Sequence, residues 1–257
     1  MLFRSFGDRQ DIVDANGNVV GSREADYVAG GWFIDKPISA IWDYKVTGIW
    51  QKNEVEEAKK YGQIPGDPKV WNNPANDQYD EQGNLVKIIY NNDDKVFQGQ
   101  TAAPVTWALR NDFTLWKDLT LSINIYSRMG HKSLESMYLN NDDDGQAMTY
   151  RLVNRNAKEY WTVDNPTNEY ARIEAQGPEG AKGARKLHNR SFIRLENISV
   201  GYTLPRTWTR KVQIDRVKVY GSVRNAAVWA KDWEGYGDPE TGNFASRIWT
   251  LGLNLTF

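Results

Sequence analysis

The feature that most constrains the fold of this chain is an alternation of apolar and polar side chains with a period of two residues. Such alternation is the mark of a β-strand whose two faces meet different surroundings. It is clearest over residues 249–257, where one face carries Trp249, Leu251, Leu253, Leu255 and Phe257. Three more segments alternate in the same way, 41–50, 119–126 and 217–224, and two alternate less regularly, 107–116 and 192–203.

These segments predict an all-β protein of six antiparallel strands, or seven if the residues before Pro37 add another. A helical pattern is confined to a short charged stretch, residues 53–61. Short turns are predicted at Trp116-Lys117-Asp118, which should form a tight hairpin, and over residues 202–211. The segments of period two therefore dominate the chain, and helices contribute little to the expected fold.

The remaining connections are long. About fifty residues separate Trp50 from Trp107, and about sixty separate Arg128 from Phe192, lengths that are uncommon for loops inside compact soluble domains. Short turns that alternate with long loops are typical of outer-membrane β-barrels, with the turns on the periplasmic side and the loops outside the cell. We therefore expect a segment of an antiparallel transmembrane β-barrel with long extracellular loops.

Composition favours the same fold. The mean hydropathy of −0.67 is hydrophilic, yet the chain holds 11 Trp and 12% aromatic residues. No run approaches the roughly 18 apolar residues that a membrane-spanning helix needs. A barrel reconciles these values, because only alternate residues of its strands meet lipid while the loops stay polar.

Aromatic spacing in two segments fits a membrane strand. Trp42 and Trp50 share a face eight residues apart, as do Trp249 and Phe257. Eight residues of strand span roughly 26 Å, or about 20 Å along the membrane normal at a tilt near 40°. We expect these rings to lie at the two borders of the apolar band, as interfacial girdles. The alternative is a soluble β-sandwich with aromatic residues at its strand ends.

Charge and cysteine content exclude several classes of partner and site. The formal net charge of −1 offers no concentrated basic surface for a nucleic acid. The chain has no cysteine, which excludes disulfides, zinc–thiolate sites and thiol catalysis. Residues 1–8 lack the apolar stretch of a signal peptide. We expect either that the protein is not exported or that this chain begins inside a longer one.

Candidate catalytic groups have simpler interpretations. Asp232 with Glu234, or Asp238 with Glu240, could flank a glycosidic bond, but chance pairs are expected among 33 acidic residues. His131 and His188 have no nucleophile or metal-ligand partner at a telling spacing. We expect no enzyme activity, no cofactor and no metal. The acidic run 140–145 is expected to be a solvated loop tip rather than a calcium site.

The last eight residues carry a specific pattern. Thr250, Gly252, Leu255 and Phe257 supply a polar residue, a glycine two positions later, a hydrophobic residue and a terminal aromatic. This octet resembles the signal that the outer-membrane barrel-assembly machinery reads. We therefore expect these four residues to act as a barrel-assembly signal.

Longer motifs extend the resemblance over most of the chain, from about Pro37 to Phe257. They are Tyr44-Lys45-Val46-Thr47-Gly48-Ile49-Trp50-Gln51, Glu56-Glu57-Ala58 before Gly66-Asp67, Ser191-Phe192-Ile193-Arg194-Leu195-Glu196-Asn197-Ile198, Gly201-Tyr202-Thr203-Leu204-Pro205, Val219-Tyr220-Gly221-Ser222-Val223-Arg224-Asn225 and Asp238-Pro239-Glu240. In this order they resemble the C-terminal portion of SusC/RagA-type TonB-linked outer-membrane transporters.

That resemblance implies a 22-stranded barrel closed by an N-terminal plug, located in the outer membrane. It also implies a SusD-like surface lipoprotein that lids the barrel, energy supplied through TonB, and oligosaccharides or, less often, peptides as substrates. This chain shows no plug, no TonB-interacting segment and no signal peptide. We therefore expect residues 1–257 to be the C-terminal part of the barrel domain, its last six or seven strands. Family members often carry a calcium-loop-like run near residues 71–98, which is not preserved here, so metal binding is not carried over.

Two loops hold candidate contacts for substrate or lid, because aromatic rings stack on sugars and amides bond hydroxyls. The residues are Trp229, Trp233 and Tyr236 before the final strand, and Trp161, Asp164, Asn165 and Asn168 in the longest loop. Packing within the loops, or contact with the lipoprotein, is the interpretation that we favour. The leading hypothesis is thus a transporter wall with extracellular loops, and the alternative is an extracellular β-sandwich that binds glycans.

Overall fold

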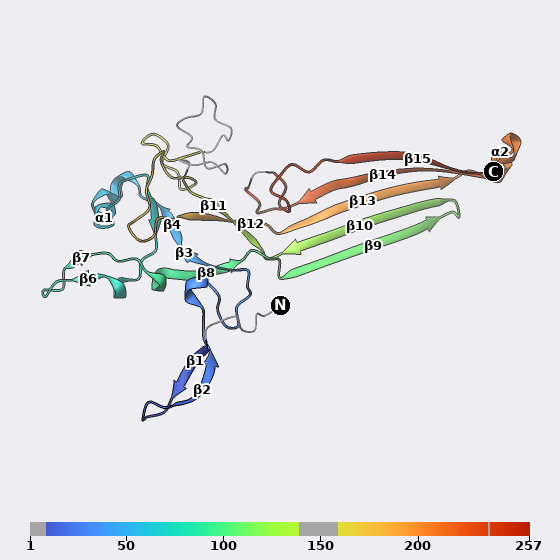
Figure 1. The fold of residues 1–257 in the computed structure, drawn as a ribbon. Coiled ribbons are helices and arrows are strands. Elements are labelled where there is room, and N and C mark those ends of the chain that lie inside the picture. The colour runs from blue at the N-terminus through green and yellow to red at the C-terminus, as the bar shows by residue number, and fades with distance from the viewer. Residues whose placement is uncertain (1–8, 139–158, 236) are drawn as a thin grey trace. The chain divides into compact units, whose positions relative to one another are not determined.

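The computed structural model describes residues 9–138, 159–235 and 237–257. The chain divides into two compact units (Figure 1). The first comprises Met1–Gln100 with Leu134–Leu187, and the second comprises Thr101–Ser133 with His188–Phe257. The described part of the chain contains no helix that is both long and apolar enough to cross a membrane.

The second unit is built on one antiparallel sheet of five strands, in the order β15-β14-β13-β10-β9. Figure 1 shows these strands as long arrows running side by side. Their bounds are Val105–Leu115 for β9, Leu119–Met129 for β10, Phe192–Thr203 for β13, Arg216–Trp229 for β14 and Ile248–Thr256 for β15. Five of the six predicted strands are therefore confirmed as neighbours in a single sheet.

The register of the sheet aligns the apolar positions of all five strands. One row across the sheet consists of Phe113, Leu121, Val200, Gly221 and Leu251. The next row in register consists of Asp112, Ser122, Ser199, Ser222 and Thr250. Since side chains one residue apart on a strand point to opposite faces, the sheet has one apolar face and one polar face.

Short connections close one end of the sheet. Between β9 and β10, Leu115 pairs with Leu119 and three residues form the turn; two of them, Trp116 and Lys117, have φ values of 47° and 71°. Between β13 and β14 lie the helical turns α2 (Arg206–Thr209) and η6 (Arg210–Val212). The predicted hairpin and modest turn are both confirmed.

Bulges interrupt the ladders near the other end. The β10–β13 register shifts at Asn124/Ile125, which leaves Glu196 of β13 unpaired, and the β13–β14 register shifts between Leu195 and Asn197. Asn225 of β14, with a φ of 52°, lies beside the second shift. Such bulges bend a strand and increase its twist.

The first unit consists of short elements from two separate parts of the chain. Its paired strands are β1 (Arg9–Val13) with β2 (Val19–Glu24), β3 (Ala40–Tyr44) with β8 (Lys95–Gln100), β4 (Val46–Ile49) with β5 (Pro68–Val70), and β6 (Gln78–Tyr79) with β7 (Leu85–Lys87). β11 (Lys132–Ser136) pairs with β12 (Arg185–Asn189) in a further two-stranded sheet, whose residues are divided between the two units. The helices are η1 (Val28–Gly30), η2 (Lys52–Glu54), α1 (Val55–Lys60), η3 (Pro74–Asn76) and η4 (Asn92–Asp94).

The core of the first unit joins both parts of the chain. Its buried members are Ile49, Val70 and Tyr90 from the first part and Met137, Trp161, Ala181 and Ala184 from the second. Hydrogen bonds link the same parts, from the Trp161 Nε1 to Gln51 Oε1 at 3.0 Å and from the Ile49 backbone N–H to Asn168 Oδ1 at 2.9 Å. The two long connections thus fold against each other and contain strands of their own.

One predicted strand is wrong. Residues 41–50 form β3 and β4, which pair with different partners in separate sheets. The Trp50 side chain is 4% exposed and its Nε1 donates to Gln63 Oε1 at 2.8 Å. Trp42 and Trp50 therefore do not form the expected pair of girdle residues. Protein covers residues on both faces of this segment, Ile41 and Ile49 on one and Trp50 on the other. A period of two does not say whether protein or lipid covers a face.

The short charged helix predicted at residues 53–61 is confirmed as η2 followed by α1. Gln51 and Glu54 form a capping box at its start, which satisfies backbone N–H groups that a helix leaves unpaired. Lys59 with Glu56 and Lys60 with Glu57 are ion pairs three residues apart. The helix lies in the first unit, so it belongs to a connection, as expected.

Candidate functional site

The apolar face of the sheet is exposed on its two edge strands, β9 and β15, and mostly half-buried on the three strands between them. Leu251 is 83% exposed, and the large apolar side chains of β9 and β15 are exposed throughout, including Trp107, Leu109, Phe113, Trp249, Leu253 and Leu255. Monomeric soluble proteins rarely expose a contiguous apolar patch larger than a few hundred Å². A surface of this kind marks a site of contact with lipid or with another protein.

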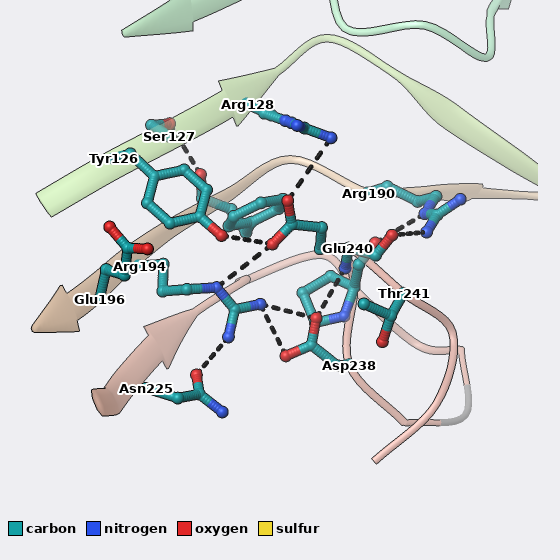
Figure 2. Close-up of polar contacts among 12 residues, drawn as sticks. Tyr126, Ser127, Arg128, Arg190, Arg194, Glu196, Asn225, Asp238, Glu240 and Thr241 are labelled. Carbon is teal, nitrogen blue, oxygen red and sulfur yellow. Dashed lines mark hydrogen bonds and ion pairs between the residues drawn. The ribbon is translucent and has the colours of Figure 1, made fainter. Parts of the chain in front are cut away.

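The polar face bears a loop at the end of the sheet opposite the short turns. This loop, residues 230–247 between β14 and β15, is held by Arg194 of β13 (Figure 2). The Arg194 Nη2 donates to both carboxylate oxygens of Asp238, at 2.6 and 2.7 Å. The two side chains are 6% and 5% exposed, so the loop is attached to the sheet by a buried ion pair in which one guanidinium nitrogen contacts both carboxylate oxygens.

Other contacts fix the same loop. Arg190 donates to the backbone carbonyls of Pro239 and Glu240, each at 2.7 Å. The Glu240 carboxylate accepts from the Tyr126 hydroxyl and lies 3.5 Å from an Arg128 nitrogen. Figure 2 shows these side chains converging from β10, β13 and the loop. The arrangement is a structural clamp made of alternating cations and acceptors.

The electrostatics of Asp238 follow from these contacts. Burial acts to raise the pKa of its carboxyl, but the hydrogen bonds from Arg194 and from the Glu240 backbone N–H outweigh that effect. The pKa of Asp238 therefore lies below its ordinary value. A carboxylate held charged in an ion pair is suited to binding and positioning.

The clamp residues were not predicted from the sequence as a group. Arg194 and Asp238 are 44 residues apart, and both lie in motifs that carried the family resemblance. The sequence offers Asp238 and Glu240 as a pair of acids and as part of a family motif, without indicating their partners. An arginine on the polar side of a strand was the available signal, but nothing local identified its partner.

The predicted contact residues fall in different units. Trp229, at the end of β14, is exposed, whereas Trp233 is half-buried and donates from its Nε1 to the Gly237 carbonyl at 3.0 Å. Tyr236 lies outside the described residues. In the first unit Trp161 is 5% exposed and belongs to the core, while Asp164, Asn165 and Asn168 are exposed. Asn168 also accepts the hydrogen bond from the backbone of Ile49.

The closing octet forms most of β15 and divides between the two faces. Thr250 and Gly252 lie on the polar face, and Leu255 and Phe257 follow the apolar alternation. The Tyr220 ring of β14 lies directly over Gly252, with its Cζ 2.2 Å from where a Cβ on Gly252 would be. The Tyr220 ring therefore occupies the space that a side chain at Gly252 would need. The predicted acidic loop tip at residues 140–145 lies outside the described residues.

Similarity to known proteins is weak in sequence and covers most of the chain. The chain is 23% identical over 239 residues, 86% of its length, to "TonB-dependent receptor P3" of Formosa agariphila. Among solved structures, the RagAB peptide transporter matches 97% of the chain with a TM-score of 0.54 and 20% identity. The RagAB peptide importer in its open-open state matches 88% with a TM-score of 0.53 and 21% identity.

The chain spans only 22% of the receptor's length, 26% of the RagAB peptide transporter chain and 23% of the open-open importer chain. No protein-family model matches it. The likeness agrees with the resemblance found in the sequence at the level of a TonB-dependent receptor. It establishes that the chain has the fold of a section of the larger RagAB transporter chains.

Proposed function

We propose that this chain is part of the wall of a TonB-dependent β-barrel transporter in the outer membrane, together with extracellular loops. The observation that carries the proposal is the register of the five-stranded sheet, which places apolar side chains on one face and polar side chains on the other. In a membrane barrel the first face meets lipid and the second lines a polar interior.

Strand length fits this assignment. The strands β9 and β10 have 11 residues each. Eleven residues extend roughly 36 Å, or about 28 Å along the membrane normal at a tilt near 40°, compared with an apolar band of about 25 Å in such barrels. The two edge strands, β9 and β15, each have one neighbour in the described sheet. Open edges are costly in lipid, so we propose that further strands of a longer protein pair with them.

The connections also fit. Short turns lie at one end of the sheet, and the connections from β10 to β13 and from β14 to β15 lie at the other. We propose that the turn end faces the periplasm and that the connections at the other end are extracellular. The β10–β13 connection contributes to the first unit. The closing octet is proposed as the segment read by the barrel-assembly machinery.

The substrates we propose are oligosaccharides or peptides, imported with energy from TonB and with a SusD-like lipoprotein as partner. The sequence motifs support this proposal, as does the likeness to proteins named TonB-dependent receptor P3 and RagAB peptide importer. The first unit, with exposed Asp164, Asn165 and Asn168, is proposed as one surface for substrate or lipoprotein.

Adjacent residues of β15 allow a direct test, because this chain has no cysteine of its own. Thr250→Cys and Leu251→Cys would be made in the full-length protein and assayed in native outer membranes. We expect a lipid-soluble maleimide to label Leu251→Cys and a charged, membrane-impermeant maleimide to label Thr250→Cys. Quantitative gel mobility shifts would measure both reactions.

The same experiment separates the alternatives. A β-sandwich would cover the apolar face with protein, so Leu251→Cys would react with neither reagent while Thr250→Cys reacted with the charged one. Rapid labelling of both positions by the charged reagent would place both faces in water. Either result would contradict the barrel proposal.

A further inference from the structure

The polar face of the sheet carries an excess of cations. Its basic side chains are Arg110, Arg128, Arg194, Arg216, Lys218 and Arg224, as the strand register places them. Its acidic side chains are Asp112 of β9 and Glu196, which accepts a hydrogen bond from the Asn124 amide on the same face. The loop that packs on this face adds Asp238 and Glu240.

Most of these charges neutralise one another. Arg110 and Asp112 form an ion pair at 2.9 Å, and Arg194 and Asp238 form one at 2.6 Å. Arg128 lies 3.5 Å from Glu240. Among the described residues the Glu196 carboxylate forms no ion pair and bonds the Asn124 amide. The three remaining cations are all on β14, where Arg216, Lys218 and Arg224 have no acidic partner among the described residues.

Most residues that pair with these three cations in the sheet are polar and uncharged. Ser222 lies between Ser199 and Thr250 in the sheet, and Arg224 lies opposite Asn197. The Lys218 side chain lies beside Gly201 of β13. Lys218 and Arg224 are six residues apart, or about 20 Å along the strand. Cations and hydrogen-bonding groups thus follow one another along the polar face of β14.

We propose that the polar face of β14 is a recognition surface for an anionic substrate, one that bears carboxylate or sulfate groups. This inference rests on the proposed function, because it takes the polar face to be the water-filled interior of the barrel. A guanidinium binds such oxyanions through two parallel hydrogen bonds, and the neighbouring hydroxyls and amides complement a polar backbone. A surface with an excess of one sign of charge also raises the local concentration of counter-ions.

The local electrostatic potential can be measured at Ser222, which lies between Lys218 and Arg224 on β14. Ser222→Cys would be made in the full-length protein in native outer membranes. Its rates with an anionic sulfonatoethyl and a cationic trimethylammonium-ethyl methanethiosulfonate would each be divided by the rate with a free thiol. We expect the anionic reagent to be favoured about tenfold, and the preference to fall as salt is added.

Matched variants assign the effect to the two cations. Adding Lys218→Gln and Arg224→Gln to Ser222→Cys should remove the preference, and neither substitution disturbs a described ion pair. Ser122→Cys is a control in the same row of the sheet, opposite Asp112, and should show a smaller preference that these substitutions leave unchanged. Heat-modifiable gel mobility would verify that every variant is assembled.

The outcomes distinguish this inference from the proposed function. If both reagents react at Ser222→Cys with equal normalised rates, or if the double substitution leaves the ratio unchanged, the anion inference is wrong and the barrel stands. If neither reagent reacts in an assembled protein, the polar face is not in water and both are wrong.

A competition experiment identifies whether the anionic substrate is a sugar or a peptide. Trigalacturonate and triglutamate would be compared with galactotriose and trialanine as inhibitors of the reaction at Ser222→Cys. Greater slowing by trigalacturonate indicates an acidic sugar, and greater slowing by triglutamate indicates an acidic peptide. Equal effects of charged and neutral competitors would overturn the assignment of substrate class.

Discussion

At the residue scale, Gly252 and Tyr220 form a pair in which a missing side chain makes room for a ring. Gly252→Ala would place a Cβ 2.2 Å from the Tyr220 Cζ. The Tyr220 ring would therefore have to move away from its position against the backbone of β15. We expect a loss of about 1–3 kcal/mol, typical of overpacking. Thermal unfolding of the purified full-length protein in detergent would measure it.

Two controls give this prediction its specificity. Gly221→Ala should be mild, because its Cβ would meet only the Thr250 carbonyl at 3.8 Å. In a Tyr220→Ala background Gly252→Ala should be nearly neutral, since the coupling between contacting residues is removed. Equal losses with and without the tyrosine ring would contradict the steric explanation.

Arg194 is the second residue whose environment allows a sharp prediction. Arg194→Ala would leave the Asp238 carboxylate buried without its partner, a change that typically costs about 3–5 kcal/mol. We expect the loop at residues 230–247 to become sensitive to added protease. Arg194→Lys should be intermediate, because one ammonium group cannot replace both the contact to Asp238 and the hydrogen bond from Arg194 Nη1 to Asn225 Oδ1. Arg110→Ala, which removes an exposed ion pair, should leave protection unchanged.

The clamp also has a predictable dependence on pH. The pKa of Asp238 is lower in the folded protein than its ordinary value of 3.8. Its contribution to stability is therefore complete above that value and is lost as the pH falls toward the folded pKa. We expect the loop to stay protected at pH 5 and to open to pepsin only below about pH 4. Loss of protection between pH 7 and 5 would contradict this assignment.

At the scale of elements, the faces of β10 and β15 should respond differently to charge. Leu121→Arg and Leu253→Arg should each cost roughly 2–4 kcal/mol if they lie near the bilayer midplane. Ser122→Arg and Asn254→Arg, on the polar face of the same strands, should be far milder. The yield of assembled protein in the outer membrane and its unfolding free energy would be compared. Equal damage at all four positions would indicate a sheet covered by protein on both faces.

Elements also show where a local pattern misleads. Residues 119–126 and 41–50 alternate equally well, yet the first becomes part of an eleven-residue strand and the second breaks into β3 and β4. The difference lies in the partners. β10 has two long neighbours in register, whereas β3 and β4 pair with separate short strands. Strand length is decided by pairing, which is a long-range property.

At the scale of the whole molecule, the first unit should behave as one cooperative structure although its chain is discontinuous. Trp161 belongs to a core formed by both parts. Trp161→Ala should cost about 3–5 kcal/mol and accelerate hydrogen exchange in residues 41–70 and in 170–187 together. The sheet from β9 to β15 belongs to the other unit and should keep its protection.

An exposed tryptophan provides the control for that experiment. Trp208→Ala in α2, where the side chain is 62% exposed, should leave exchange in the first unit unchanged. Acceleration confined to the segment around residue 161 would show that the two parts fold separately, contrary to the shared core.

The sequence alone determined the strands of the sheet and the face of each side chain. The predicted bounds 192–203 coincide with β13, and the apolar alternation of β10, β14 and β15 became one continuous face. These properties follow from the period of two, which any short window of the chain contains. The pattern of four residues within the last eight is also local, and its role as an assembly signal stays a prediction.

Only the tertiary structure decided how the strands pair and what the charged groups do. The Arg194–Asp238 pair, the ring over Gly252 and the unneutralised cations of β14 each depend on residues that are distant in sequence or on a neighbouring strand. The same holds for Trp50 and Trp161, whose burial required two connections to fold together. Alternation in the sequence specifies that a face is apolar. Whether protein or lipid covers that face, and how much free energy its burial contributes, depends on the long-range fold.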